Sequence, residues 1–190
     1  MPFSALGLAP SLAHAAASQG LIAPTPVQSQ AIPAILNGHD LRACAPTGSG
    51  KTAAYVLPLL QQWLLSDAAQ RQGSRSTQAL VLVPTRELAA QVAELIYHVG
   101  EAMGRRPKVA VLTGGVSINP QLMALRGGAD MVIATPGRLL DVVAHSQLKL
   151  HTIDTLVMDE ADRLLDLGFA EELEQVLALL PAKTARQTLL

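Results

Sequence analysis

Short apolar segments alternate with longer amphipathic ones along the chain. The apolar segments are three to five residues long and comprise Leu41–Ala45, Ala79–Val83, Val109–Leu112, Met131–Ala134 and Leu156–Met158. Apolar residues recur at helical spacing in Lys51–Leu65, Arg86–Glu101, Gly137–Ala144 and Ala170–Leu180. Because the short segments lack the in-and-out alternation of a half-exposed strand, they fit strands covered on both faces. The pattern predicts an α/β fold with a mainly parallel β-sheet and helices on both of its faces.

Two further segments have the composition of a surface loop and of an additional strand. Ser66–Gln78 is polar and rich in Gln, Ser and Arg, which predicts a surface loop. Pro181 ends the last helix, and Gln187–Leu190 has the composition of one more buried strand. Since the sequence stops within that strand, we expect the chain to be a truncated piece of a longer protein.

Composition narrows the class of protein. The 190 residues suffice for one domain, and 49% hydrophobic against 15% charged residues exclude a disordered chain. No apolar run approaches the roughly 20 residues that cross a bilayer, so we expect no membrane partner. The N-terminus has no signal-peptide pattern and Cys44 is the only cysteine, which we expect to be buried in a strand. A cytoplasmic protein is therefore expected.

Charge and histidine content give no direct pointer to a ligand. The net charge is −1, so any nucleic-acid partner has to be inferred from local motifs. The five histidines are scattered without metal-ligand spacing, which speaks against a site made by protein ligands alone.

The strongest local motif lies between the first predicted strand and the first predicted helix. It reads Ala45-Pro46-Thr47-Gly48-Ser49-Gly50-Lys51-Thr52, the pattern of a phosphate-binding loop except for Ala45 at the first glycine position. Its backbone N–H groups and the helix N-terminus suit phosphate oxygens. Lys51 can reach the β- and γ-phosphates, and Thr52 can ligate Mg²⁺. The alternative is an ordinary strand-to-helix turn.

Two adjacent carboxylates follow the strand predicted at Leu156–Met158. In nucleotide hydrolysis one acid must hold hydrated Mg²⁺ and a second must orient or deprotonate the attacking water. Asp159 fits the first role and Glu160 the second. The alternative is a solvated helix N-terminus, where acids are favoured without any chemistry.

Together these motifs resemble those of a known protein family. Asp159-Glu160-Ala161-Asp162 spells DEAD in one-letter code, and the chain resembles the N-terminal RecA-like domain of DEAD-box ATP-dependent RNA helicases. The other motifs stand in family order: Pro84-Thr85-Arg86-Glu87-Leu88-Ala89, Gly114-Gly115 and Thr135-Pro136-Gly137-Arg138. The stretch Gly114–Gln121 further resembles the bacterial RhlE-type subgroup, which is associated with ribosome assembly and RNA turnover. The resemblance implies a Q-motif segment at residues 1–29 and a RecA-like P-loop core at 30–190, ending just before motif III.

The Q motif implies recognition of adenine. Gly20, Pro24-Thr25 and Gln28 match it, and Phe3 stands at the upstream aromatic position. The Gln28 amide carries a donor and an acceptor that suit the N6 and N7 edge of adenine but not guanine. Phe3 is predicted to stack on the base, the alternative being that it anchors the N-terminal segment in the core. The expected cofactors are therefore ATP or ADP with Mg²⁺, bound by Phe3, Gln28 and Pro46–Thr52, with Lys51, Asp159 and Glu160 in the chemistry and Thr52 and Asp159 on the metal.

The family implies RNA as the second ligand. The predicted RNA-binding residues follow strands and would line one edge of the sheet: Pro84, Thr85, Arg86, Gly115, Thr135, Pro136, Gly137 and Arg138. Backbone N–H groups, hydroxyls and arginines suit phosphates and sugars, so binding should not depend on base sequence. Without the family, Thr85 reads as a helix N-cap and Thr135-Pro136 as another helix start.

The resemblance also implies a second domain in the complete protein. The second RecA-like domain, with its arginine finger, would be a partner in the same protein, and Asp162 would couple the two domains. We expect the chain alone to bind nucleotide, to contact RNA weakly and hardly to hydrolyse ATP, because such fingers are worth about 10³ to 10⁵ in rate. Two alternatives remain: a DNA-directed P-loop translocase, and a nonhydrolytic, nucleotide-gated binding module.

Overall fold

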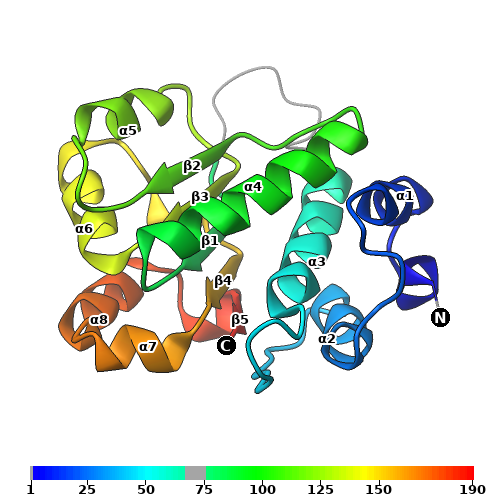
Figure 1. Cartoon of the computed structure of the whole chain (residues 1–190). Helices are drawn as coiled ribbons and strands as arrows, with labels where there is room; N and C mark the ends of the chain where they lie inside the picture. The colour runs from blue at the N-terminus through cyan, green and yellow to red at the C-terminus, as the bar shows by residue number, and fades with distance from the viewer. Residues whose placement is uncertain (1, 67–75) are drawn as a thin grey trace.

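The computed structural model describes residues 2–66 and 76–190. Five parallel strands form one sheet in the order β2-β3-β1-β4-β5 (Figure 1). They are β1 (Ala79–Leu82), β2 (Val109–Leu112), β3 (Met131–Ala134), β4 (Thr155–Met158) and β5 (Gln187–Leu189). The predicted parallel α/β fold is confirmed, and β1 to β4 lie within one residue of the predicted bounds.

Eight α-helices and three short 3₁₀ helices are found in the described residues. The α-helices are α1 (Pro10–Ser18), α2 (Pro26–Leu36), α3 (Lys51–Leu65), α4 (Arg86–Ala102), α5 (Asn119–Ala124), α6 (Pro136–His145), α7 (Ala161–Asp166) and α8 (Ala170–Leu179). The 3₁₀ helices are η1 (Phe3–Leu6), η3 (Leu150–Thr152) and η4 (Lys183–Ala185). No helix within the described ranges is long and apolar enough to span a bilayer.

The sheet divides the core into two layers. Alternate residues of each strand point to opposite faces: Val81 and Ile133 belong to one cluster of buried side chains, whereas Leu80 and Val132 belong to the other. The first cluster contains residues of α1 to α4, and the second contains residues of α6 and α8. Figure 1 shows these two groups of helices on opposite sides of the strands. Burial on both faces explains why the strand sequences are continuously apolar.

The strand predicted at Leu41–Ala45 is not formed as a regular strand. The segment lies parallel to β5 through a single bridge between Leu41 and Leu189, with backbone hydrogen bonds of 2.7–3.1 Å. Leu41, Ala43 and Ala45 are half-buried, whereas Arg42 and Cys44 between them are exposed. The expectation that Cys44 is buried is therefore wrong, because one face of this segment is not covered by the core. The surface loop predicted at Ser66–Gln78 falls mostly on residues 67–75, which lie outside the described residues.

Candidate functional site

The loops that carry the motifs meet at one edge of the sheet. Because the strands are parallel, every segment that follows a strand emerges at the same edge. In the spatial order β2, β3, β1, β4 these segments begin at Thr113, Thr135, Val83 and Asp159. Neighbouring segments are joined by backbone hydrogen bonds, such as Thr135 N to Leu112 O and Asp159 N to Leu82 O, both 3.0 Å. The predicted RNA-binding loops therefore lie over β2, β3 and β1, and the predicted nucleotide site lies over β4 and β5.

The phosphate-binding loop turns sharply through two glycines. Gly48 and Gly50 have φ of +76° and +90°, the left-handed region that other residues rarely adopt. Gly50 is the N-cap of α3. The Lys51 ammonium donates hydrogen bonds to the carbonyl oxygens of Ala45 and Pro46, the latter at 3.2 Å. These contacts draw the ammonium group toward the loop and use two of its three N–H donors.

A cavity of about 590 Å³ opens beside this loop. It is lined from three directions: by the segment next to β5, by the start of α3, and by the residues that follow β4. Its lining includes Cys44, Thr47, Lys51, Tyr55, Asp159, Glu160 and Asp162. The two motifs singled out for nucleotide chemistry thus face one hollow, which a strand-to-helix turn and a solvated helix N-terminus would not require.

Gln28 connects the N-terminal segment with the phosphate-binding loop. Its Oε1 accepts from the Thr25 backbone N–H at 2.9 Å, and its Nε2 donates to Gly50 O at 3.1 Å. The first contact belongs to a capping box that starts α2. Gln28 is 1% exposed and does not line the cavity as described, so adenine reaches its amide only if these contacts rearrange. Adenine pairing by Gln28 stays a prediction.

Phe3 lies in the hydrophobic core. It is 3% exposed, sits in η1, and belongs to the same buried cluster as Ile32 and Ile35 of α2. It is not among the described residues that line the cavity. This placement matches the alternative in which Phe3 anchors the N-terminal segment, and stacking on adenine stays a prediction.

Asp159 is held by a buried tyrosine. The Tyr55 hydroxyl donates to Asp159 Oδ2 at 2.8 Å, and the two residues are 6% and 8% exposed. Burial raises the pKa of the Asp159 carboxyl, while the hydrogen bond from Tyr55 lowers it. Burial, together with the neighbouring Asp159 charge, raises the pKa of Tyr55 well above its ordinary value. One carboxylate oxygen is thereby fixed.

The residues predicted to hold Mg²⁺ fit that ion. Mg²⁺ keeps several waters and binds one or two protein oxygens together with substrate phosphates. The Tyr55 hydroxyl interacts with both the Thr52 side chain and Asp159, so the two predicted ligands approach the same point. No cluster of three or more His, Cys, Asp or Glu exists in the described residues. Binding of Mg²⁺ by Thr52 and Asp159 together with a nucleotide stays a prediction.

Glu160 has an unusual backbone. Its φ and ψ are both 50°, and it is the one non-glycine residue with positive φ in the described part of the chain. Strain of this kind gathers at functional sites. Its Oε2 accepts from Arg163 Nη1 at 2.9 Å, so Arg163 fixes the side chain predicted to orient water. Asp162, predicted to couple two domains, is exposed beside it.

The residues predicted to bind RNA differ in how accessible they are. The Arg86 side chain is 58% exposed and its Nη2 lies 3.5 Å from Glu87 Oε1. Thr85 caps α4 by accepting from Leu88 N at 3.2 Å, as its alternative reading predicts. Pro84 and Pro136 are buried, so their side chains face the core and not the edge. Thr135 and Gly137 are half-buried at the start of α6.

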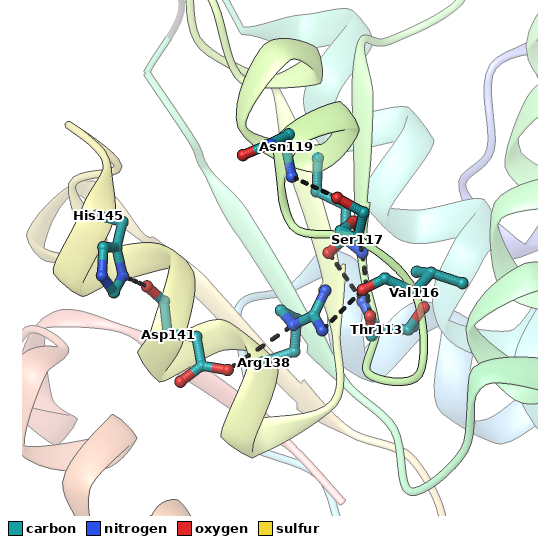
Figure 2. A network of polar contacts seen from close by, with 8 residues as sticks. Thr113, Val116, Ser117, Asn119, Arg138, Asp141 and His145 are labelled. Atoms are coloured by element: carbon teal, nitrogen blue, oxygen red, sulfur yellow. Dashed lines mark hydrogen bonds and ion pairs between the residues drawn. The ribbon is translucent and has the colours of Figure 1, made fainter.

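Arg138 points into the protein. Its side chain is 13% exposed, its Nη2 donates to Val116 O at 3.0 Å, and its Nε lies 3.8 Å from Asp141 Oδ2. Figure 2 shows Arg138 reaching from α6 to the loop of Val116 and Ser117. In this geometry Arg138 supports the loop that carries Gly115, and the side chain that is predicted to contact RNA is largely buried.

Three contacts of the site were not anticipated from the sequence. Tyr55 stands one helical turn after Lys51 on α3, a spacing that places both on one helix face. Thr25-Pro26-Val27-Gln28 has the pattern of a capping box, which signals the local role of Gln28. Arg163 stands three residues after Glu160, a helical spacing at which the two side chains pair.

Comparison with known proteins agrees with this geometry. The family model described as DEAD/DEAH box helicase matches residues 25–190. The DEAD-box ATP-dependent RNA helicase CshA of Streptococcus pneumoniae is 42% identical over 100% of this chain, which covers 34% of that protein. The ATP-dependent RNA helicase dbp10 of Schizosaccharomyces pombe is 43% identical over 99% of the chain and is covered to 21%. The chain thus spans about a third of the length of the first relative and about a fifth of the second.

Two solved structures of related proteins have a similar fold. The yeast DEAD-box splicing factor Prp28 superposes with a TM-score of 0.86 at 33% identity, covering 96% of this chain and 44% of the other. A hypothetical ATP-dependent RNA helicase from Sulfolobus tokodaii gives a TM-score of 0.78 at 35% identity over 94% of this chain and 48% of the other. Relatives from a bacterium, fungi and an animal, such as DDX54 of Mus musculus, do not support a bacterial RhlE-type subgroup.

Proposed function

Because the chain belongs to the DEAD/DEAH box helicase family, we propose that it is the ATP-binding motor domain of an RNA helicase. The parent protein would couple ATP binding and hydrolysis to local, sequence-independent unwinding or remodelling of RNA duplexes. The observation that carries the proposal is the shared cavity: Lys51 of the phosphate-binding loop, and Asp159 and Glu160 after β4, line the same hollow.

The residues of the site have separate tasks in this proposal. Lys51, drawn toward the loop by its contacts with Ala45 and Pro46, binds the phosphates. Asp159, whose Oδ2 is held by Tyr55, and Thr52 would hold the Mg²⁺, Asp159 through a water. Glu160, held by Arg163, orients the attacking water and accepts its proton. ATP would be the donor of the phosphoryl group, and Mg²⁺, when bound, would neutralise negative charge on the phosphates.

RNA is proposed to bind along the loops over β2, β3 and β1. Arg86 supplies an exposed cation, and an added Cβ on Gly115 would lie 3.9 Å from its Nη1, so the two loops are adjacent. The second RecA-like domain of the same protein is the proposed partner of Asp162 and would bring the arginine finger. We propose ribosome-assembly or RNA-decay factors as protein partners and the cytoplasm as the location of the parent protein. The RhlE-type subgroup, predicted from Gly114–Gln121, is not proposed.

Replacing Glu160 with Gln in the complete parent protein tests the proposal. The variant should bind ATP as the wild type does but lose RNA-stimulated hydrolysis by about 10² to 10⁴, the usual contribution of a general base. Steady-state ATPase assays with and without single-stranded RNA measure this. Unchanged turnover would contradict the role of Glu160, and a wild-type protein without turnover would favour a nucleotide-gated binding module. Equal stimulation by DNA would favour a DNA translocase.

A further inference from the structure

The loop that carries the two adjacent glycines is the most exposed part of the proposed RNA surface. It runs from Thr113 to Ile118 between β2 and α5, and residues 114–117 are all exposed. Gly115 has a φ of +77°, which glycine adopts without strain, and because glycine has no side chain its backbone is not covered by one. A loop of this kind needs support from elsewhere to keep a single shape.

The support comes from a side chain that no predicted site includes. Gln121 on α5 is 8% exposed. Its Nε2 donates to Thr113 O at 3.0 Å and lies 3.5 Å from Ser117 O, and its Oε1 accepts from Thr113 N at 3.2 Å. The amide therefore pairs with both backbone groups of the first loop residue and also contacts a residue four positions later.

The middle of the loop is held from a different helix. Arg138 on α6 donates to Val116 O at 3.0 Å, and Figure 2 shows Val116, Ser117 and Thr113 grouped around this contact. Gln121 thus joins the two ends of the turn while Arg138 fixes its centre. An apolar residue of equal volume at 121 would fill the same space but would leave the buried backbone groups of Thr113 without the side-chain partner they have.

We propose that Gln121 is a positioning residue for RNA binding. It acts through the loop: by closing the turn from Thr113 to Ser117 it keeps the exposed backbone of Gly114 and Gly115 ready for a phosphate, so that binding does not have to order the loop. The inference rests on the proposed RNA surface. It adds a residue outside that surface that sets the affinity of the surface for RNA.

Two substitutions separate this role from a general contribution to the fold. Gln121→Glu keeps the shape and the acceptor for Thr113 N but replaces the donor with an acceptor that faces Thr113 O and Ser117 O. Gln121→Met keeps the volume and removes both hydrogen-bonding groups. Gln61 provides matched controls: it is 6% exposed on α3, accepts from Ala9 N at 2.7 Å, and stands ten residues, about 15 Å, along the helix from Lys51.

The experiment is an NMR titration of the ¹⁵N-labelled chain with a ten-nucleotide oligouridylate, paired with calorimetric titration by Mg²⁺–ADP. We expect both Gln121 variants to raise the RNA dissociation constant about tenfold, which is the loss of one net hydrogen-bond contribution, with ADP affinity within about twofold of wild type. ¹⁵N relaxation should show lower order parameters at residues 114–117. Gln61→Glu and Gln61→Met should leave RNA affinity and loop order unchanged.

The possible outcomes are distinct. Wild-type RNA affinity in both Gln121 variants overturns the inference. Parallel losses of RNA and ADP affinity also overturn it, since they mean that Gln121 only stabilises the fold. If the wild-type chain shows no shifts in residues 114–117 on adding RNA, the proposed RNA surface itself is wrong, and Gln121 loses its proposed role with it.

Discussion

Replacing Tyr55 with Phe removes one oxygen atom from the centre of the proposed nucleotide site. That oxygen donates a 2.8 Å hydrogen bond to Asp159 Oδ2, and both side chains are at least nine-tenths buried. The ring stays in place, so packing in the α3 layer is preserved. The variant therefore removes the hydrogen bond to a buried carboxyl group, together with the interaction of the same hydroxyl with the Thr52 side chain.

The size of the effect depends on the charge of Asp159. A hydrogen bond to an ionised group contributes about 1.5–3 kcal/mol to the free energy of unfolding, and one between neutral groups about 0.5–1.5 kcal/mol. For a chain of 190 residues the charged value corresponds to a loss of roughly 4–8 °C in Tm.

The pH dependence follows from the direction of the pKa shifts. Burial already raises the folded-state pKa of Asp159, and loss of the Tyr55 hydrogen bond raises it further. An acid whose folded pKa lies above its unfolded value of about 3.9 is most stabilising when protonated, and this stability is lost as the pH rises through the folded pKa. The deficit of Tyr55→Phe in unfolding free energy is therefore larger at pH 7 than at pH 4.

Urea unfolding of the Mg²⁺-free chain at both pH values measures the deficit. Tyr97→Phe is the matched control, because Tyr97 donates to the backbone oxygen of Val109 at 3.1 Å and is 37% exposed. Its deficit should be about 1 kcal/mol or less at either pH. Equal stability of Tyr55→Phe and wild type at pH 7, or a larger deficit at pH 4, would refute the reasoning.

Three further substitutions probe the backbone of the site. Gly50→Ala places a Cβ against Gln28 Nε2 at a φ of +90° and should lower the free energy of unfolding by about 2–4 kcal/mol. Gly48→Ala, with open space around it, should lower it by about 1 kcal/mol. Urea unfolding measures both, and equal losses would show that Gln28 does not pack against Gly50. Glu160→Gly relieves the strain of the left-handed backbone and should raise the free energy of unfolding by about 0.5–1 kcal/mol. It should also abolish ATP hydrolysis by the parent protein. A lower free energy of unfolding in urea would argue against stored strain at this position.

Most of the fold can be predicted because its strands are buried on both faces. Leu80, Val81 and Leu82 belong to opposite core layers, so the segment is apolar at every position and is easily recognised. Leu41–Ala45 has a similar composition but one exposed face, and whether it pairs depends on β5, nearly 150 residues away. Composition alone does not contain that partner.

The sequence predicts which loops lie together, whereas the directions of some side chains depend on contacts that the sequence does not show; the binding roles of these residues stay predictions. Lys51, Asp159 and Glu160 meet because parallel strands deliver their following residues to one edge. Arg138 was expected to face RNA, yet it turns inward because the Val116 carbonyl oxygen, in another loop, accepts its hydrogen bond. Gln28 was expected to face a base, yet its amide caps α2 and contacts Gly50. Such orientations are set by tertiary partners.

The most direct test of the central claim is calorimetric titration of this chain with ADP and with GDP in the presence of Mg²⁺. We expect ADP to bind more tightly than GDP. Lys51→Ala should weaken ADP binding by about 10- to 100-fold through loss of a charged contact, and Gln28→Ala should remove the preference for adenine. Binding of neither nucleotide by the folded chain would contradict the assignment of the cavity beside Lys51 and Asp159 as an ATP site.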